Sequence, residues 1–322
     1  MTQSAGIRKA ERFAAIDVGS NSVKLSLAVA GSGRRPAVIE TARIVSQLGQ
    51  KAKKDGTLHV GSMERTAEAI AEMVEEARRQ DASMIRAVAT SAAREAPNGA
   101  DLKERVRALA GIELEIISGQ TEAALAFKAV SSHHIVDDHS SLVFDTGGGS
   151  TEIILADNYD IRSCDSIPCG ALRLAEQFDA KGRTSSKVVA AIRENVREGL
   201  EAVRRKAIDT TIAVGMGGTC TALALLDIGP LPVPRNGKPP AILRENHTMA
   251  RETVEARLTW LRKMDIEERK ERTGLRTRRA EIIVAGACIV AEILAVFEME
   301  WVALLDVGLR DGLLIEMMQP QD

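Results

Sequence analysis

Two segments of the chain share one pattern of apolar and polar positions. Each has an apolar run, then an aspartate and a short turn of glycine and serine, then a second apolar run. The first segment covers residues 13–30 and contains Asp17, and the second covers residues 142–156 and contains Asp145. Two apolar runs around such a turn predict a β-hairpin. Because the same hairpin occurs twice in register, the pattern indicates two related halves.

Elsewhere the apolar residues predict helices and strands in alternation. From Ser62 to Gln80 they recur at the spacing of a helix with one buried face, and Ser62 can cap this helix. Short apolar runs predict strands within residues 84–89, 112–117, 211–214 and 302–306. The stretch from Ala280 to Phe297 is nearly all apolar, which predicts a buried helix. Strands that alternate with helices throughout indicate an α/β protein.

Composition narrows the classes of function. The chain has 322 residues, which suggests two domains or one large domain. Its 43 basic and 45 acidic residues give a formal charge of -2, so no overall positive field attracts a polyanion. Aromatic residues make up only 2%, which is too few for the stacking platforms of single-strand binders. We therefore expect no nucleic acid polymer as a partner.

Cysteine usage and the length of the apolar runs predict a cytoplasmic protein. The four cysteines form no Cys-x-x-Cys pair, and a chain of this length needs no disulfide framework. Residues 1–12 are polar and basic and lack the apolar stretch of a signal peptide. The longest apolar run, residues 282–297, is short for a membrane span and contains Glu292. We expect no membrane association.

Glycine-rich turns that follow apolar strands are typical of phosphate-binding loops. Such turns occur at Gly19, at Gly147–Gly149 and at residues 215–218. Glycine lets the backbone approach a phosphate closely and turn its N–H groups toward it. A helix that begins at the turn adds a partial positive charge. A single glycine turn is usually only a turn, but the repeated pair with its two aspartates favours a phosphate site.

The two aspartates predict a divalent cation at the same site. Asp17 and Asp145 end corresponding strands, so their carboxylates would repel a phosphate chain unless a cation lies between them. Mg²⁺, with Mn²⁺ as the alternative, is held by one or two carboxylates together with water and phosphate oxygens. Two lobes that each supply a loop and an aspartate would form a cleft around the phosphates. The motifs GxxxxGK[ST], GxGxxG and GxSxG do not occur, which disfavours P-loop, dinucleotide-binding and serine-hydrolase chemistry.

At these residues the chain resembles the Ppx/GppA family, the exopolyphosphatases and guanosine pentaphosphate phosphatases of the actin-like superfamily. The resemblance covers nearly the whole chain and rests on AIDVGSNS at 15–22, ATSAAR at 89–94, FDTGGGSTE at 144–152, GMGGT at 215–219 and DVGLRDG at 306–312. It implies a two-lobed, ribonuclease H-like fold of the actin-like ATPase type with an interdomain cleft. Residues 1–124 with about 300–322 would form one lobe, and residues 125–299 the other.

The resemblance also implies a catalytic residue. The family's Ile-Ser-Gly-x-Glu-Glu-Ala motif falls on residues 117–123, and its catalytic second glutamate is Glu122 here. Thr121 replaces the first glutamate, and Ala124 replaces the arginine usual after the motif. Glu122 would orient and deprotonate a water molecule that attacks the terminal phosphorus. Without the resemblance, Glu122 would be an ordinary carboxylate in the first turn of a helix.

The other site residues implied by the resemblance fall into two groups. Asp17, Asp145 and Glu152 would hold the cation or its waters. Arg94 would contact phosphate bidentately, although on the sequence alone a surface ion pair is an equal alternative. The complete set that would bind phosphate is Gly19, Ser20, Asn21, Ser22, Arg94, Gly147, Gly148, Gly149, Ser150, Thr151, Gly217, Gly218 and Thr219.

The implied function is exopolyphosphatase activity, which removes orthophosphate from the end of inorganic polyphosphate. A guanosine pentaphosphate (pppGpp) 5′-phosphatase would use the same site, and the proline-rich residues 229–240 could recognise its base. A non-catalytic polyphosphate or nucleotide sensor is a third alternative, against which the retained Glu122 argues. Residues 262–279 hold eight basic against four acidic residues, which predicts a solvated helix face or a polyphosphate track. The family leads us to expect a homodimer.

Overall fold

The chain folds into two sheets, each flanked by helices. The computed structural model describes residues 10–30, 35–50, 55–206, 209–229 and 247–319. The elements around the first sheet are β1 (Arg12–Val18), β2 (Val23–Ala30), β3 (Pro36–Ile44), α1 (Val60–Arg79), β4 (Ala82–Ala89), α2 (Ser91–Glu95), α3 (Gly99–Ala110) and β5 (Leu114–Ile116). Those that follow are α4 (Gly119–Ser131), β6 (Ser140–Thr146), β7 (Thr151–Asp157), β8 (Asp160–Ile167), α5 (Ala171–Gln177), α6 (Ser186–Arg204), β9 (Ile212–Met216), α7 (Gly217–Ile228), β10 (His247–Ala250), α8 (Arg251–Leu261), α9 (Ile266–Thr273), α10 (Thr277–Val296), β11 (Trp301–Leu304) and α11 (Leu309–Met318).

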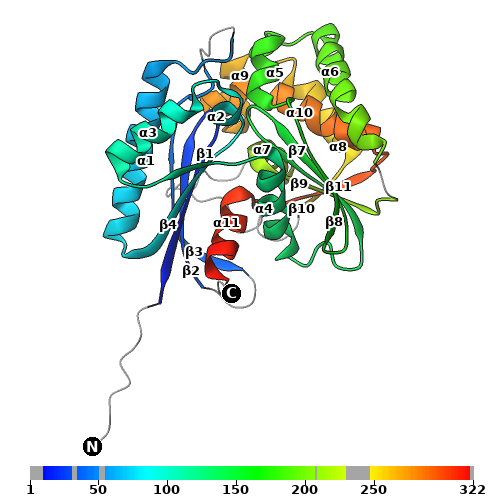
Figure 1. Cartoon of the computed structure of the whole chain (residues 1–322). Helices are drawn as coiled ribbons and strands as arrows, with labels where there is room; N and C mark the ends of the chain where they lie inside the picture. The colour runs from blue at the N-terminus through cyan, green and yellow to red at the C-terminus, as the bar shows by residue number, and fades with distance from the viewer. Residues whose placement is uncertain (1–9, 31–34, 51–54, 207–208, 230–246, 320–322) are drawn as a thin grey trace, which may run out of the picture.

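The two sheets share one strand arrangement (Figure 1). In the first, the order is β3-β2-β1-β4-β5, with β1 to β3 antiparallel and β4 and β5 parallel to β1. In the second, the order is β8-β7-β6-β9-β11-β10, with β6 to β8 antiparallel and β9 and β11 parallel to β6. The strand β10 extends the second sheet at its edge. This repeat confirms the two related halves and the two-lobed actin-like α/β fold.

The central strands and one long helix form the cores of the lobes. The strand β1 is buried from Phe13 to Val18, and β7 is buried from Thr151 to Ala156. Near-continuous apolar runs of this kind belong to strands that are covered on both faces. The helix α10 is buried at every position from Ile282 to Leu294 and packs against α5, α6 and α8. The prediction of a buried apolar helix is therefore confirmed.

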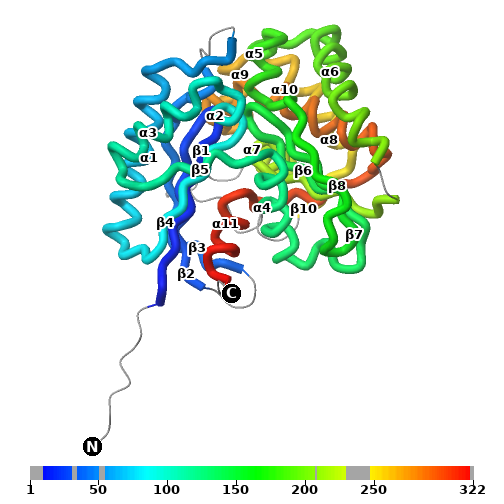
Figure 2. The backbone as a smooth tube through the Cα atoms, viewed as in Figure 1, coloured from blue at the N-terminus to red at the C-terminus, as the bar shows by residue number. Residues whose placement is uncertain are grey.

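Helices α4 and α11 cross between the two sheets. Figures 1 and 2 show α11, in red, beside α4. A Cβ at Gly312 would come 1.8 Å from the carbonyl oxygen of Leu125, so glycine is what lets the two helix backbones touch. Glu316 of α11 accepts hydrogen bonds from Arg86 of β4 (2.9 Å) and from Lys128 of α4 (3.2 Å). The crossing thus joins the two lobes.

We propose a division into lobes that follows these contacts. The helix α11 packs against β1, whereas α4 packs against β7 and β8 of the second sheet. The strand β11 pairs with β9, so it also belongs to the second sheet. Relative to the expected boundaries at residues 124 and about 300, the packing of α4 places its start in the second lobe, and the strand pairing places all of β11 there.

Three further expectations from the sequence concern membrane helices, the cysteines and the segment proposed to bind a nucleotide base. Among the helices that the structure describes, none is long and apolar enough to cross a membrane. All four cysteines are free thiols, and Cys169, Cys220 and Cys288 are buried. Of the segment expected to recognise a nucleotide base, residues 230–240 lie outside the described residues.

Candidate active site

The two predicted phosphate hairpins have the same backbone geometry. In the first, the N–H of Gly19 donates to the carbonyl of Ser22 (3.1 Å), and in the second Gly147 donates to Ser150 in the same way (3.0 Å). The flanking strands pair in register up to each turn. The repeated sequence pattern therefore produces a repeated loop at the end of each lobe's first central strand.

The loops of the two lobes meet at Gly149. The hydroxyls of Ser20 and Ser91, both from the first lobe, are hydrogen-bonded at 3.1 Å. A Cβ at Gly149 of the second lobe would come 2.4 Å from the Ser91 oxygen and 2.7 Å from the Ser20 oxygen. Only glycine fits without displacing these hydroxyls. The geometry thus brings both predicted phosphate loops to one place.

The third glycine-rich turn begins helix α7 beside Asp145. Gly217 has φ +82, and a Cβ there would lie 2.3 Å from Oδ1 of Asp145. A Cβ at the neighbouring Gly218 would lie 1.9 Å from the guanidinium of Arg279. Gly217 requires glycine, because its backbone is left-handed and its Cβ would also crowd the Thr146 carbonyl. A side chain at Gly218 would instead have to displace the guanidinium of Arg279. The N-terminus of α7, the positive end of its dipole, therefore lies against the carboxylate of the second hairpin.

Glu122 lies in the first turn of α4 and is held by an arginine of the first lobe. Ser118 caps the helix, since its hydroxyl accepts from the N–H of Thr121 (3.0 Å). Nη1 of Arg94 donates to Oε2 of Glu122 (2.9 Å) and to the carbonyl of Ile117 (3.2 Å). The Glu122 side chain is 13% exposed and that of Arg94 is 21% exposed. This ion pair fixes the carboxylate close to the remaining acidic side chains.

Burial and mutual repulsion raise the pKa values of three carboxyl groups. Burial raises the pKa of Glu122 to about 9, and the charge of Glu152 adds to the effect. Burial, followed by the charge of Asp145, raises the pKa of Glu152 to about 7. Burial also raises the pKa of Asp145 to about 6; Lys24 lowers it and Asp17 raises it further. Three carboxyl groups whose environment favours the protonated form therefore gather where the glycine loops meet.

The carboxylates of this region fit Mg²⁺ when water and phosphate supply the remaining ligands. The acidic side chains offer carboxylate oxygens, which are the ligands that hard cations prefer. Among the described residues, no three acidic, histidine or cysteine side chains are arranged to hold an ion by themselves. Mg²⁺ commonly uses one or two carboxylates and takes its other ligands from water and phosphate. The residues present suit that arrangement, and a bound cation would lower the pKa values that burial and repulsion raise.

Several predicted phosphate ligands use their hydroxyls within the protein. The hydroxyl of Ser150 donates to Glu152 (2.8 Å), and that of Thr151 donates to the carbonyl of Cys169 (2.6 Å). The hydroxyl oxygen of Thr219 is buried, and the described residues give it no hydrogen-bond partner. Any contact of Ser150 or Thr151 with phosphate would therefore come from the backbone while these bonds persist.

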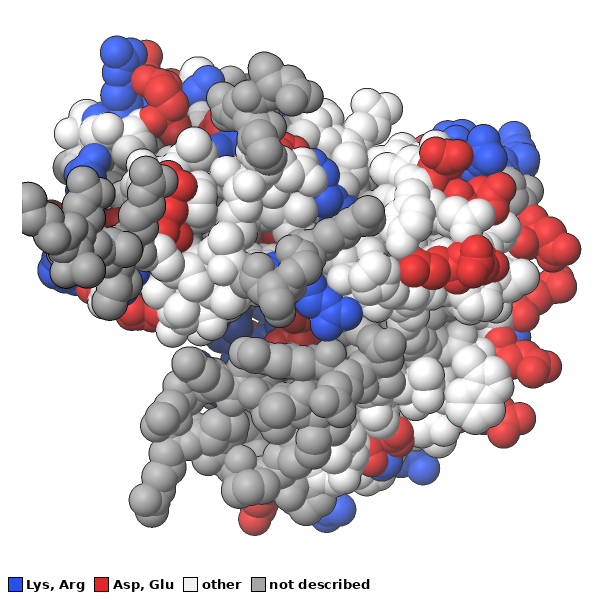
Figure 3. Space-filling view, turned by 90° about the horizontal axis from the view of Figure 1, so that it is seen from below, with Lys and Arg blue, Asp and Glu red and all other residues white. Residues whose placement is uncertain are grey.

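Three further residues reach the site without having been singled out from the sequence. Ser91 contacts the Gly149 loop, Ser166 donates to Glu152 (2.8 Å), and Arg279 lies against Gly218. Ser91 lies within the ATSAAR motif, and Arg279 ends the basic stretch, so the sequence carries a signal for both residues. Ser166 had none, because β8 enters the site only through sheet pairing. Separately from these contacts, the face of the molecule that is seen from below in Figure 3 is hollowed near its middle, where basic and acidic side chains lie together.

Comparison with known proteins identifies the family. A model of the Ppx/GppA phosphatase family matches residues 25–321. The chain belongs to this family. It is 26% identical over 315 residues to a Mycobacterium tuberculosis protein named exopolyphosphatase 1. The aligned region covers 96% of this chain and 89% of that protein. The Ppx/GppA fold is also found in a solved family member from Aquifex aeolicus, with a TM-score of 0.80, 28% identity and coverage of 96% and 98% of the two chains.

A second kind of relative carries a different name. A Vibrio vulnificus protein named guanosine-5'-triphosphate,3'-diphosphate pyrophosphatase is 27% identical over 312 residues. The match covers 95% of this chain but only 59% of that protein. Membership in the Ppx/GppA phosphatase family therefore identifies the chain as a phosphatase-type hydrolase, with relatives named for two different substrates.

Proposed function

We propose that this Ppx/GppA phosphatase is an exopolyphosphatase, which hydrolyses the terminal phosphoanhydride bond of inorganic polyphosphate and releases orthophosphate. The observation that carries the proposal is the placement of Glu122. This carboxyl group is nearly buried, is held by Arg94 and interacts electrostatically with Glu152 and Asp145. The glycine-rich loops of both lobes meet in the same region. A base, an arginine and backbone donors together suit phosphoryl transfer to water.

The residues of the chain would divide the reaction between them. Glu122 would orient a water molecule and take its proton as the water oxygen attacks the terminal phosphorus. The bond from that phosphorus to the bridging oxygen breaks, and its electron pair remains on the shortened chain. The N–H groups of the glycine loops would stabilise the added negative charge. Arg94, which is already fixed by Glu122, would contact the transferred phosphate.

The carboxylates beside Glu122 would take the metal. Asp145 and Glu152, with Asp17, would hold Mg²⁺ or its waters. When bound, Mg²⁺ would offset the charges that raise the Glu122 pKa and neutralise phosphate oxygens. Without that charge compensation Glu122 keeps its proton at neutral pH, because its pKa is raised to about 9. Activity of this chain should therefore require a divalent cation.

The test is phosphate release from long-chain polyphosphate and from pppGpp, measured side by side with Mg²⁺. We expect the unmodified chain to release phosphate from polyphosphate, and Glu122→Gln to lower the rate by about 10²–10⁴-fold, the range for a general base. The matched control is Glu113→Gln, since Glu113 is an exposed glutamate whose side chain is 67% accessible. Turnover of pppGpp alone would replace this proposal with the 5′-phosphatase function. Binding of both substrates without release would indicate a sensor.

Two further expectations accompany the proposed function. We propose that the chain acts in the cytoplasm, where its four free cysteines suit a reducing compartment. We also propose a homodimer, as expected for the family. Sedimentation of the purified protein tests the second expectation, and a monomer at all concentrations would contradict it.

A further inference from the structure

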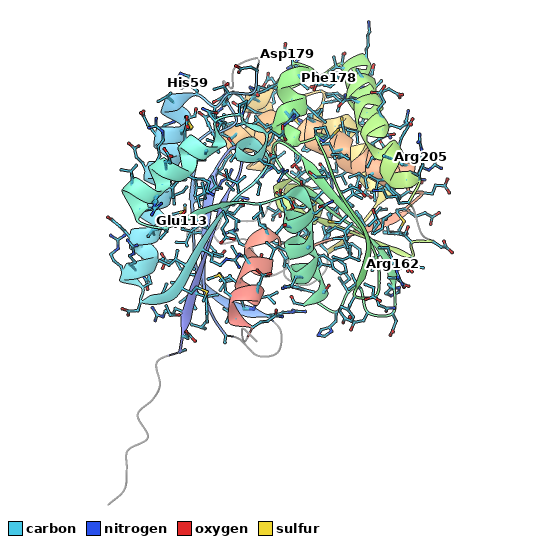
Figure 4. The ribbon with its side chains drawn as sticks, viewed as in Figure 1. His59, Glu113, Arg162, Phe178, Asp179 and Arg205 are labelled. Atoms are coloured by element: carbon cyan, nitrogen blue, oxygen red, sulfur yellow. The ribbon has the colours of Figure 1, made fainter. Side chains whose placement is uncertain are left out.

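A cavity of about 220 Å³ lies outside the carboxylate cluster, on the side of the first lobe. Its lining consists of Gln47, Gln50, His59, Ser62 and Arg65. The two glutamines belong to the loop after β3, and the other three belong to the start of α1. Figure 4 shows His59 at the upper end of α1. None of the five lining residues is acidic.

The cavity wall is hydrogen-bonded to the first phosphate loop. The N–H of Gln47 donates to the carbonyl of Asn21 (3.0 Å), and the N–H of Gly49 donates to the carbonyl of Ser20 (2.8 Å). Gln47 has φ 55, a left-handed conformation that costs a non-glycine residue energy and that these bonds hold in place. When the side-chain amide of Gln47 is oriented with its oxygen toward Arg278 on α10, this oxygen accepts from the Arg278 guanidinium. The cavity therefore lies where the first phosphate loop meets the second lobe.

The lining groups can all donate hydrogen bonds, and positive charge gathers there. Nδ1 of His59 accepts from the N–H of Gly61 (3.2 Å), so in the neutral ring Nε2 carries the hydrogen. Arg65 donates to the Ser62 hydroxyl (3.0 Å), and the described part of the chain gives it no ion pair. The first turn of the 20-residue helix α1 contains no acidic residue that would offset the positive end of its dipole. A ligand rich in acceptor oxygens and negative charge matches these groups.

We propose that this cavity is a second anion subsite, which holds a phosphate group of the substrate remote from the bond that is hydrolysed. The proposal rests on the proposed function and deepens it, since it assigns Arg65 and His59 to substrate selection. Long-chain polyphosphate supplies a remote phosphate along its chain, and pppGpp supplies one in its 3′-diphosphate. Tripolyphosphate has only two phosphates beyond its terminal one. The subsite thus favours long or branched substrates over short ones.

The experiment compares Arg65→Gln with the unmodified chain on three substrates: long-chain polyphosphate, pppGpp and tripolyphosphate. Losing a charged hydrogen bond to phosphate should raise KM for a substrate that reaches the subsite by about tenfold or more. The value of kcat and the KM for tripolyphosphate should not change. The control is Arg79→Gln at the far end of α1, where the arginine side chain is 65% exposed. Arg65 is exposed too, so neither substitution removes a buried side chain.

The pattern of KM values identifies the source of the bound phosphate. A rise for polyphosphate alone assigns the subsite to the chain, and a rise for pppGpp alone assigns it to the 3′-diphosphate. An unchanged KM for both, or an equal rise for all three substrates, overturns the subsite. If the unmodified chain hydrolyses none of them, the proposed function fails separately. Equilibrium binding of long-chain polyphosphate then decides, because the subsite predicts about tenfold weaker binding by Arg65→Gln and an unchanged affinity overturns it.

Discussion

The two phosphate hairpins have the same backbone geometry but differ in the charges that face each other across their strands. In the first, Asp17 pairs across the strands with Lys24, and their charged atoms form an ion pair at 3.1 Å. In the second, Asp145 pairs across the strands with Glu152, so two carboxyl groups occupy the corresponding positions. Like charges placed opposite each other in a sheet are destabilising. One lobe therefore neutralises its aspartate, whereas the other retains negative charge that needs a proton or a cation.

The two loops also differ in the space around them. The first loop carries side chains at Ser20 and Asn21, where the second has Gly148 and Gly149. Only the bare backbone of the second loop can approach the serine hydroxyls of the first lobe. The two copies of the hairpin therefore differ in packing: the backbone of the second loop lies against the serine side chains of the first lobe. The difference suggests that the second lobe contributes most of the reactive charge.

Among the changes that test this comparison, removing the charge that distinguishes the second hairpin should have the largest effect. Glu152→Gln should lower phosphate release by about 10- to 100-fold and raise the Mg²⁺ concentration needed for half-maximal activity, as for groups that orient a metal or its waters. The measurement is a Mg²⁺ titration of initial rates. Lys24→Gln changes the corresponding position of the first hairpin and is the control. An equal loss in both variants would contradict a direct role of Glu152 in holding the metal.

A smaller effect is expected from the close approach of the loops. Gly149→Ala should destabilise the fold by about 1–3 kcal/mol, since its Cβ would overlap two hydroxyl oxygens. Gly148→Ala is the matched control, because the nearest atoms to its Cβ would lie at 3.7 and 3.8 Å, an ordinary contact distance. Denaturant unfolding of both variants measures the difference. Equal stability would show that the lobes are not in contact at this loop in solution.

The charged cluster also predicts how stability depends on pH without a divalent cation. The pKa of Glu152 is raised to about 7 and that of Asp145 to about 6, so the folded state binds more protons than the unfolded state. The pKa of Glu122, raised to about 9, adds to this difference, so stability should fall as the pH rises from about 4.3, the pKa of an unfolded glutamate, toward 9. Denaturant unfolding in the presence of a chelator measures this slope. Glu152→Gln should make the slope of stability against pH shallower, whereas Glu113→Gln should leave it unchanged. A stability that rises over this interval would disprove the prediction.

The smallest effect concerns the ion pair of the first hairpin. Lys24→Gln should cost about 0.2–1 kcal/mol of stability, since the lysine side chain is 39% exposed and water screens the pair. The cost should shrink when the salt concentration is raised. Unfolding at low and high salt provides the measurement. A cost above about 2 kcal/mol, or one that does not respond to salt, would mean that this pair behaves like a buried one.

The sequence predicted the elements whose apolar residues form continuous or periodic runs. The two hairpins, the helix α1 and the buried helix α10 were recognisable because burial on fixed faces leaves a pattern. The strands β3 and β8 were not predicted. β3 alternates between exposed and partly buried positions, and β8 begins with three exposed residues. A strand at the edge of a sheet is partly exposed to water, so whether it forms depends more on pairing with its neighbour than on its own composition.

The loops of the site follow from local sequence, because a glycine-rich turn depends on residues only a few positions apart. Which side chains face each other depends instead on how distant segments of the chain pack together. Arg94 and Glu122 meet because α2 and the start of α4 lie at the junction of the lobes, and Arg279 reaches Gly218 from 61 positions further along the chain. The raised pKa values likewise depend on burial, which no local pattern records. Local geometry follows from neighbours in the chain, whereas charge, contact and proton affinity follow from packing between lobes.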